Sequence, residues 1–291
     1  MIDTKTIVEI EKLLKNEKIV NTKLLSNSFN INCYKLLLSD NKEYVVKYYA
    51  NKNLEFNAIY AEARNLAFLN NLKENRFPNV IEFTNKYLIM SYIENNNIQP
   101  EETKNDFLES IVSIHNNNND KYGFEYDSQI GGLKQDNEYN KSWINFFSEK
   151  RLYYIYNLIN KTNSMNKKIN FKIEFLLKKL KDFLPDNPKP SLLHGDLWEG
   201  NILFNNKNFV GFIDPGSFFG HNEMEVAYLR WFNPSFIDKF FIEKYSNFIN
   251  LDKNYFSYEP VYQLYYSLCN VALWDKSYIE ETKRLLIKLK I

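Results

Sequence analysis

The sequence is poor in the residues and segments that mark secreted and membrane proteins. Its only two cysteines, Cys33 and Cys269, lie far apart and show no pairing pattern, which favours a reducing compartment and two buried thiols. No run approaches the ~20 apolar residues that cross a bilayer, and residues 1–16 form a charged amphipathic pattern without the apolar core of a signal peptide. We therefore expect a soluble cytoplasmic protein that does not bind a membrane.

The sequence also lacks an excess of charge of one sign. Lys plus Arg number 37 and Asp plus Glu 36, so the formal net charge is +1. A nearly neutral chain does not gather nucleic acid by long-range attraction, and we expect no nucleic-acid partner. The length of 291 residues excludes a short peptide-like module and fits an enzyme built from two lobes.

The segment 193–220 contains polar residues at the ends of apolar runs, at a spacing typical of magnesium-dependent phosphoryl transfer. Asp196 and Asn201 reproduce the Asp-x-x-x-x-Asn spacing of a kinase catalytic loop. In such a loop the aspartate accepts the proton of the attacking hydroxyl, and the asparagine holds a metal ion. Asp214 is the expected second ligand, because magnesium prefers hard oxygen donors and keeps several waters. The alternative is that these aspartates cap turns, a role that Asp and Asn often have.

The order of predicted elements indicates an α+β fold with a protein-kinase-like bilobal architecture. Residues 1–94 are predicted to form a nucleotide-binding lobe with an antiparallel sheet, and residues 95–291 a helical lobe that contains the catalytic loop and the acceptor site. Extended runs are expected at 19–25, 33–38, 43–49, 80–83 and 86–90. Helices are expected at 1–15, 54–74, 103–116, 141–159, 167–184, 223–232, 236–249, 261–274 and 278–290.

One lysine and one glutamate in the first lobe are expected to form an ion pair. Lys47 occupies an otherwise apolar strand, where an unpaired cation is costly. Glu62 lies three residues after Ile59 and four before Leu66, so it projects from the apolar stripe of its helix. The pair matches the strand lysine and helix glutamate of kinases, in which the lysine contacts phosphate. The alternative is an exposed edge-strand lysine and a glutamate that reaches solvent.

The last strand of this lobe leads into a polar linker that is a candidate for adenine recognition. Backbone groups of Ser91, Tyr92 and Ile93 are expected to meet the adenine edge, and Met90 to line the pocket behind it, although a plain core strand explains Met90 equally well. The predicted phosphate loop, residues 26–33, contains no glycine. Asn and Ser also form tight turns, so the loop is expected to take a different backbone shape.

With these residues in place, the chain resembles the fructosamine kinase or ketosamine-3-kinase family, relatives of the aminoglycoside and choline phosphotransferases. HGDLWEGN at 194–201 and IDPGSFFGHNEMEVA at 213–227 are similar to two of its motifs, and YGFEYDSQIGGLKQDN at 122–137 and WINFFSEKRL at 143–152 to two others. The resemblance implies transfer of the γ-phosphoryl of ATP, with Mg²⁺, to a sugar hydroxyl of a ketoamine. The substrate is either a small molecule or a glycated lysine, and we expect a monomer or a weak homodimer.

The resemblance also implies an acceptor pocket with Trp198 as one wall. A sugar amine is often cationic, so carboxylates are expected there, with Glu199, Glu223 and Glu225 as candidates and helix capping as the preferred role of Glu223. His221 is interpreted as a hydrogen-bonded loop or core histidine, and His115 likewise as structural.

Three departures from the family pattern concern nucleotide and substrate binding. The family usually has paired glycines at Asn27 and Ser28, an aspartate at Glu225, and an Asn-His pair at Cys269 and Asn270. Two other functions stay open: phosphotransfer to an aminoglycoside, choline or another small alcohol, and a catalytically impaired pseudokinase or binding module.

Overall fold

The computed structural model describes residues 2–49, 55–72, 76–161 and 165–291. The chain divides into two compact units. Unit 1 consists of Met1–Ile98, Ser128–Lys134 and Ile202–Gly216, and unit 2 consists of Gln99–Asp127, Gln135–Asn201 and Ser217–Ile291. The first stretch of unit 1 ends close to the expected boundary at residue 94, but two later segments also join this unit.

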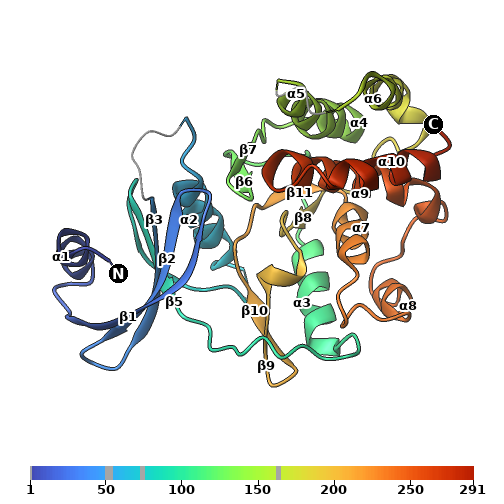
Figure 1. Ribbon diagram of the computed structural model, residues 1–291. Helices are drawn as coiled ribbons and strands as arrows, with labels where there is room; N and C mark the ends of the chain where they lie inside the picture. The colour runs from blue at the N-terminus through green and yellow to red at the C-terminus, as the bar shows by residue number, and fades with distance from the viewer. Residues whose placement is uncertain (1, 50–54, 73–75, 162–164) are drawn as a thin grey trace. The chain divides into compact units, whose positions relative to one another are not determined.

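Unit 1 is built on a five-stranded antiparallel sheet with the strand order β1-β2-β3-β5-β4. The strands are β1 (Ile19–Ser28), β2 (Ile31–Leu38), β3 (Glu43–Tyr49), β4 (Val80–Phe83) and β5 (Tyr87–Ser91). All five predicted strands are therefore present. Helix α1 (Thr4–Leu13) and helix α2 (Ala58–Leu69) lie on opposite faces of this sheet (Figure 1). The predicted helix 54–74 is shorter in the structure, and its residues 54, 73 and 74 lie outside the described residues.

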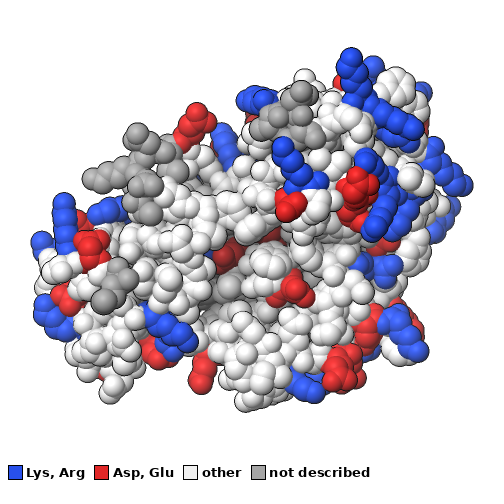
Figure 2. Space-filling model, viewed as in Figure 1, with Lys and Arg blue, Asp and Glu red and all other residues white. Residues whose placement is uncertain are grey.

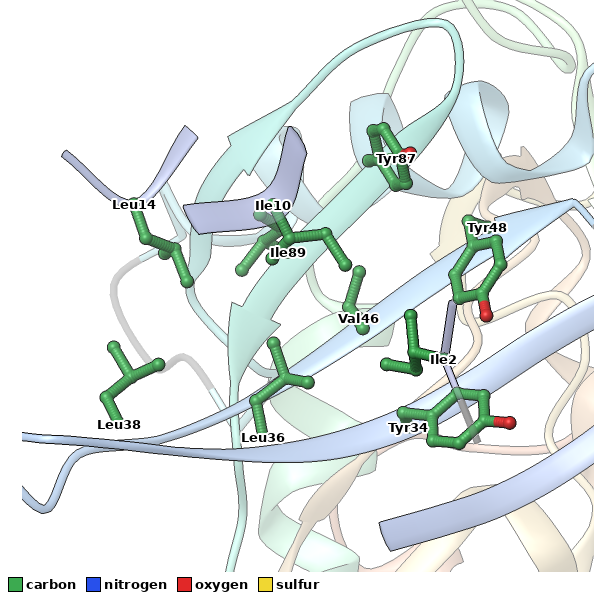
Figure 3. Close-up of a cluster of buried hydrophobic side chains, with 10 residues drawn as sticks. All are labelled: Ile2, Ile10, Leu14, Tyr34, Leu36, Leu38, Val46, Tyr48, Tyr87 and Ile89. Carbon is green, nitrogen blue, oxygen red and sulfur yellow. The ribbon is translucent and has the colours of Figure 1, made fainter. Parts of the chain in front are cut away.

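The alternation of side chains along the strands separates an apolar face from the face that holds Lys47. Val46 and Tyr48 of β3 join a buried cluster that includes Ile10 of α1 and Ile89 of β5 (Figure 3). Because successive residues of a strand point to opposite faces, Lys47 points to the other side of the sheet. The strand period therefore explains why a charged residue stands in an apolar strand.

The β1–β2 turn forms without glycine. Phe29 and Asn30 have φ angles of 50° and 64°, and the strands pair up to the Ser28–Ile31 position. Two consecutive left-handed residues are typical of a type I′ hairpin turn, which matches the twist of the strands. Asparagine tolerates this conformation, whereas a bulky phenylalanine adopts it at a cost of roughly 1 kcal/mol. The loop is thus a tight hairpin that forms without glycine.

Short hairpins later in the chain complete unit 1. Strands β9 (Ile202–Asn205) and β10 (Asn208–Phe212) pair antiparallel. The amide N–H of Phe212 donates to the carbonyl of Arg76, and the N–H groups of Asn96 and Asn97 donate to the carbonyl of Phe204. These backbone bonds hold the segment that carries Asp214. Strands β6 (Ser128–Ile130) and β7 (Leu133–Gln135) form another hairpin, which the sequence patterns did not predict.

Unit 2 is mainly helical. It contains α3 (Asn105–His115), α4 (Trp143–Phe147), a π-helix (Ser148–Tyr153), α5 (Tyr154–Asn160), α6 (Lys167–Lys179), α7 (Asn222–Phe232), α8 (Phe241–Ser246), α9 (Tyr255–Leu273) and α10 (Tyr278–Lys288). Strand β8 (Ser191–Leu193) pairs with the unpredicted strand β11 (Phe218–Gly220). No helix in the described part of the chain is long and apolar enough to cross a membrane.

Four of the predicted helices in unit 2 differ from the structure. The helix predicted at 167–184 ends at Lys179 and is followed by a 3-10 turn, Leu180–Asp182. The predicted helix 141–159 contains the π-helix in its middle. Helix α8 starts at Phe241, not at residue 236, because Asp238 forms a turn in which its carboxylate accepts from the N–H of Phe240. Helix α9 begins at Tyr255 and includes Pro260, which we had expected to precede it. A proline near the start of a helix removes only one backbone bond.

Candidate active site

Lys47 lies at the centre of a buried ion cluster in unit 1. Its Nζ donates to Glu62 Oε1 at 2.7 Å and to Oε2 at 2.9 Å, and also to Asp214 Oδ1 at 2.6 Å. Lys47 is 6% exposed and Glu62 3% exposed. The predicted pair is therefore present in the structure, and a third predicted site residue, Asp214, joins it. The alternative of an exposed lysine and a solvent-directed glutamate is wrong.

The charges in this cluster shift one another's protonation. Burial lowers the pKa of Lys47, but the carboxylates of Asp214 and Glu62 outweigh burial and raise it above its ordinary value. Burial raises the pKa of Glu62, and the ammonium of Lys47 opposes that rise. The ammonium is thus held as a fixed cation by two acidic partners. A fixed cation is the group that a phosphate-binding site requires.

Asp214 combines a constrained backbone with a partly accessible carboxylate. Its φ angle is 57°, in the left-handed region that aspartate tolerates better than most residues. While Oδ1 accepts from Lys47, 36% of the side chain stays exposed. Non-glycine residues in this conformation are common at functional sites, where the surrounding fold holds them. Asp214 is therefore oriented by its backbone and by Lys47, and its side chain stays partly exposed.

The loop that carries Asp196 is held from beneath by Glu225 of α7. The carboxylate of Glu225 accepts from the backbone N–H of His194 at 3.0 Å and of Gly195 at 2.7 Å, and Oε2 also lies 3.0 Å from His115 Nε2. Burial raises the pKa of Glu225, but hydrogen bonds from His115 and from the loop backbone lower it below its usual value. An ionised, fully buried carboxylate thus fixes the backbone just before Asp196.

Asp196 itself is 7% exposed and lies among polar and aromatic partners in unit 2. The hydroxyl of Tyr228 donates to Asp196 Oδ1 at 3.4 Å, and the backbone N–H of Asp196 donates to His194 Nδ1 at 3.3 Å. Asn201 Nδ2 donates to the carbonyl of Asp196 at 2.8 Å. That bond fixes the amide orientation, so Asn201 Oδ1 is the atom of this side chain that suits a metal ion. These contacts hold both the backbone and the carboxylate of Asp196 in the loop.

Tyr228 is a site residue that the sequence patterns missed. It follows Glu225 by three residues on the buried face of α7, so one helix face supports the loop backbone and also contacts the Asp196 carboxylate. Burial, reinforced by the negative charge of Asp196, raises the pKa of Tyr228 well above its ordinary value. The sequence does contain a signal that could have identified Tyr228: an acidic residue and a tyrosine stand three positions apart on an otherwise apolar helix face.

Trp198 of the same loop lies between Phe232 of α7 and Gly200 of the loop itself. Its ring centroid lies 5.8 Å from that of Phe232, and a Cβ at Gly200 would lie 2.3 Å from its Cη2 atom. Glycine at position 200 is therefore required by the ring. Trp198 is half-buried, as a wall of a pocket would be, and the neighbouring Glu199 is likewise half-exposed.

The other candidate carboxylates and histidines have partners inside unit 2. Glu223 accepts from the N–H of Asp252 and from the hydroxyl of Tyr258, and it does not cap its helix with its side chain. Glu223 and Glu225 are both buried, so neither presents its charge to an acceptor. His221 Nδ1 lies 2.8 Å from the hydroxyl of Tyr262, and burial lowers the pKa of His221 to about 3. The interpretation of His221 and His115 as structural histidines is confirmed by these contacts.

The run predicted to contact adenine is partly engaged in the sheet of unit 1. Met90 is buried on β5. The N–H of Ser91 donates to the carbonyl of Asn79, and the N–H of Tyr92 donates to that of Glu43. The carbonyl of Ile93 accepts from Asn95 Nδ2. The N–H groups of Ser91 and Tyr92 are therefore already engaged within unit 1.

The donor atoms suit magnesium better than a softer metal. Among the described residues, no group of three or more His, Cys, Asp or Glu side chains is arranged to hold a metal ion. The proposed ligands are instead one carboxylate and one amide, which are hard oxygen donors that magnesium accepts together with phosphate oxygens and water. Asp214 is part-exposed and Asn201 is oriented by its amide nitrogen, so both side chains fit that ligand set.

Comparison with solved structures defines the class of fold. The chain superposes on a putative fructosamine-3-kinase from Thermobifida fusca with a TM-score of 0.88 and 22% identity, covering 98% of each chain. It matches APH(2'')-IIa in a complex with gentamicin with a TM-score of 0.67 and 20% identity, covering 100% of this chain and 95% of the other. The fold is that of the protein-kinase-like phosphotransferases.

The sequence comparisons identify the family. The family model described as fructosamine kinase matches residues 3–291. A probable ketoamine kinase from Enterococcus faecium is 31% identical over 204 residues, which span 69% of this chain and 70% of that protein. The chain belongs to the fructosamine kinase family and is an enzyme of the kinase class.

Proposed function

We propose that this enzyme uses ATP and Mg²⁺ to phosphorylate a sugar hydroxyl of a ketosamine. The acceptor is of the fructosamine or ribulosamine type, either free or linked to a protein lysine. Membership of the fructosamine kinase family supports the substrate class. The observation that carries the proposal is the buried contact of Lys47 with both Glu62 and Asp214, because kinases use these residue types in this arrangement to bind ATP phosphates and metal.

The residues of unit 1 supply the nucleotide half of the reaction. Lys47 neutralises phosphate charge, and Glu62 keeps its ammonium in position through two hydrogen bonds. Asp214 is the proposed carboxylate ligand of Mg²⁺. The ion, when bound, supplies charge neutralisation on the phosphates. We assign the adenine side to Met90, Ser91, Tyr92 and Ile93, whose positions at the end of β5 support that role.

The residues of unit 2 supply the acceptor half. The acceptor hydroxyl oxygen attacks the γ-phosphorus, the bond from that phosphorus to the ADP oxygen breaks, and Asp196 takes the hydroxyl proton. Asn201 is the proposed amide ligand of the metal. Trp198 and Glu199 border the sugar, and the fixed ring of Trp198 suits stacking against a sugar face.

An assay of ADP release with purified protein tests this function. The acceptors are fructosamine and ribulosamine derivatives of lysine, a glycated peptide, choline and an aminoglycoside. We expect turnover with at least one ketoamine, dependence on Mg²⁺, and a ketoamine kcat/KM at least tenfold above that of the other alcohols. A preference for choline or the aminoglycoside would show that the acceptor is a small alcohol of that type and not a ketosamine. Magnesium-dependent binding of ATP without turnover of any acceptor would favour a pseudokinase.

A further inference from the structure

Unit 2 contains a pocket of about 420 Å³, which is lined by residues at the end of α7 and around the start of α10. Its walls combine three aromatic rings with charged side chains. The lining residues are Trp231, Phe232, Ser277, Tyr278, Glu280, Glu281 and Arg284. None of these residues has a role in the reaction proposed above.

A continuous series of ring contacts connects this pocket to the catalytic loop. Trp198 packs on Phe232, the ring of Phe232 lies 5.1 Å from that of Trp231, and Trp231 lies 5.9 Å from Tyr278. Tyr228, which contacts Asp196, also packs on Phe232 with centroids 5.3 Å apart. Phe232 is thus shared between the proposed sugar wall and the pocket. A substrate that stacks on Trp198 has this pocket as its neighbouring site.

The most enclosed charge in the pocket is negative. The side chain of Glu281 is 26% exposed, whereas that of Arg284, which donates to Glu281 Oε2 at 3.4 Å in an exposed ion pair, is 76% exposed. Glu280 is 68% exposed and pairs with Lys283 on the same helix. The indole N–H of Trp231 donates to Glu281 Oε1 at 3.2 Å and holds the carboxylate beside the rings. A held carboxylate and three aromatic faces together favour a cation on an aliphatic chain.

We infer that this pocket binds the aglycone of the ketoamine, specifically an aliphatic amine chain such as lysine that carries its own ammonium group. The inference rests on the proposed function, because it assigns the non-sugar part of the same acceptor. The alkyl chain packs against Phe232, Trp231 and Tyr278, and the ammonium is placed next to Glu281. Glu281 is then a specificity residue for the aglycone and takes no part in phosphoryl transfer.

The test compares two variants on three acceptors. Glu281→Gln removes the charge and keeps an oxygen for the indole N–H of Trp231, and Glu243→Gln on α8 is the control at an exposed position. The acceptors are Nε-fructosyl-lysine, its Nα-acetylated form, which lacks the ammonium, and 1-deoxy-1-methylamino-fructose, which lacks the chain. We expect Glu281→Gln to raise KM for fructosyl-lysine about fivefold, with kcat unchanged, and to leave KM for the other two acceptors unchanged. The effect should shrink at high salt.

The outcomes separate failure of the inference from failure of the proposed function. Equal changes in KM for all three acceptors, or no change for fructosyl-lysine, would overturn the assignment of the pocket while ketoamine kinase activity stands. If the wild-type enzyme phosphorylates none of the three acceptors although it binds MgATP, the proposed function fails and the inference falls with it. Tyr278→Leu provides a second variant, with the thermal midpoint as the folding check. It should also raise KM for fructosyl-lysine relative to the methylamino compound.

Discussion

The Lys47 cluster of unit 1 and the Asp196 loop of unit 2 are stabilised by different interactions. The Lys47 cluster joins one ammonium directly to two carboxylates. In the Asp196 loop, by contrast, the hydroxyl of Tyr228 donates to the Asp196 carboxylate, and Glu225 accepts from the backbone N–H groups of His194 and Gly195.

The difference fits the roles proposed for the two sites. A phosphate site needs a permanent cation, and carboxylates on either side keep lysine charged when it is buried. A general base needs to accept a proton, so an ammonium bound directly to it would suppress its basicity. On the visible face of the molecule, Lys and Arg are interspersed with Asp and Glu (Figure 2).

The largest expected effect comes from neutralising Asp196. Asp196→Asn keeps the shape of the loop and removes the proton acceptor, so kcat on a ketoamine should fall by about 10³-fold. The change is measured by steady-state ADP release at saturating ATP, with circular dichroism as the folding control. Activity within a factor of ten of the wild type would show that Asp196 is not the base.

Removal of the cation from the other site should cost stability in addition to weakening the binding of ATP phosphates. Lys47→Met leaves the buried carboxylate of Glu62 without its ammonium, and we expect the free energy of unfolding to drop by about 3 kcal/mol. Urea denaturation measures this change. Adding Glu62→Gln should recover part of the loss, because the two positions are coupled. Strictly additive effects of the two substitutions would contradict a direct pair.

A smaller effect is expected when the support of the Asp196 loop is weakened. Glu225→Gln replaces one of two acceptor oxygens by an amide that faces the N–H groups of the loop, and stability should fall by about 2 kcal/mol. Because the loop backbone positions Asp196, kcat should fall as well, while KM for ATP should stay constant. Thermal unfolding and kinetics together test this, with Glu243→Gln as the surface control. A loss of ATP affinity without a change in kcat would count against it.

The smallest predicted effect is a dependence of stability on pH. The pKa of His221 is lowered to about 3 in the folded protein, below its value of about 6.5 when unfolded. Neutral His221 therefore contributes fully to the free energy of unfolding above pH 6.5. This contribution is lost as the pH falls, by about 1 kcal/mol between pH 7 and pH 5.5. Chemical denaturation at both pH values measures the free energy of unfolding. This free energy should change less between the two pH values in His221→Asn than in the wild type. An unchanged difference would show that His221 is not buried as a neutral group.

The Lys47–Glu62 pair was predictable from the sequence because strand and helix periodicity fix which face each residue occupies. Lys47 stands in a clear β pattern, and Glu62 stands in a clear helical stripe. Strands such as β11, with only three residues, have too few positions to show a period. Asp214 and Lys47 are 167 residues apart in sequence, so their contact is visible only in the folded chain.

Binding of MgATP to matched variants tests the central claim most directly. Isothermal titration should give the same Kd for the wild type and for Asp196→Asn, because Asp196 is assigned to the acceptor. Asp214→Asn should bind at least tenfold more weakly, and removal of Mg²⁺ should then make little further difference. If Asp214→Asn binds MgATP as tightly as the wild type, or if Asp196→Asn loses binding, the division of the chemistry between the two sites is wrong.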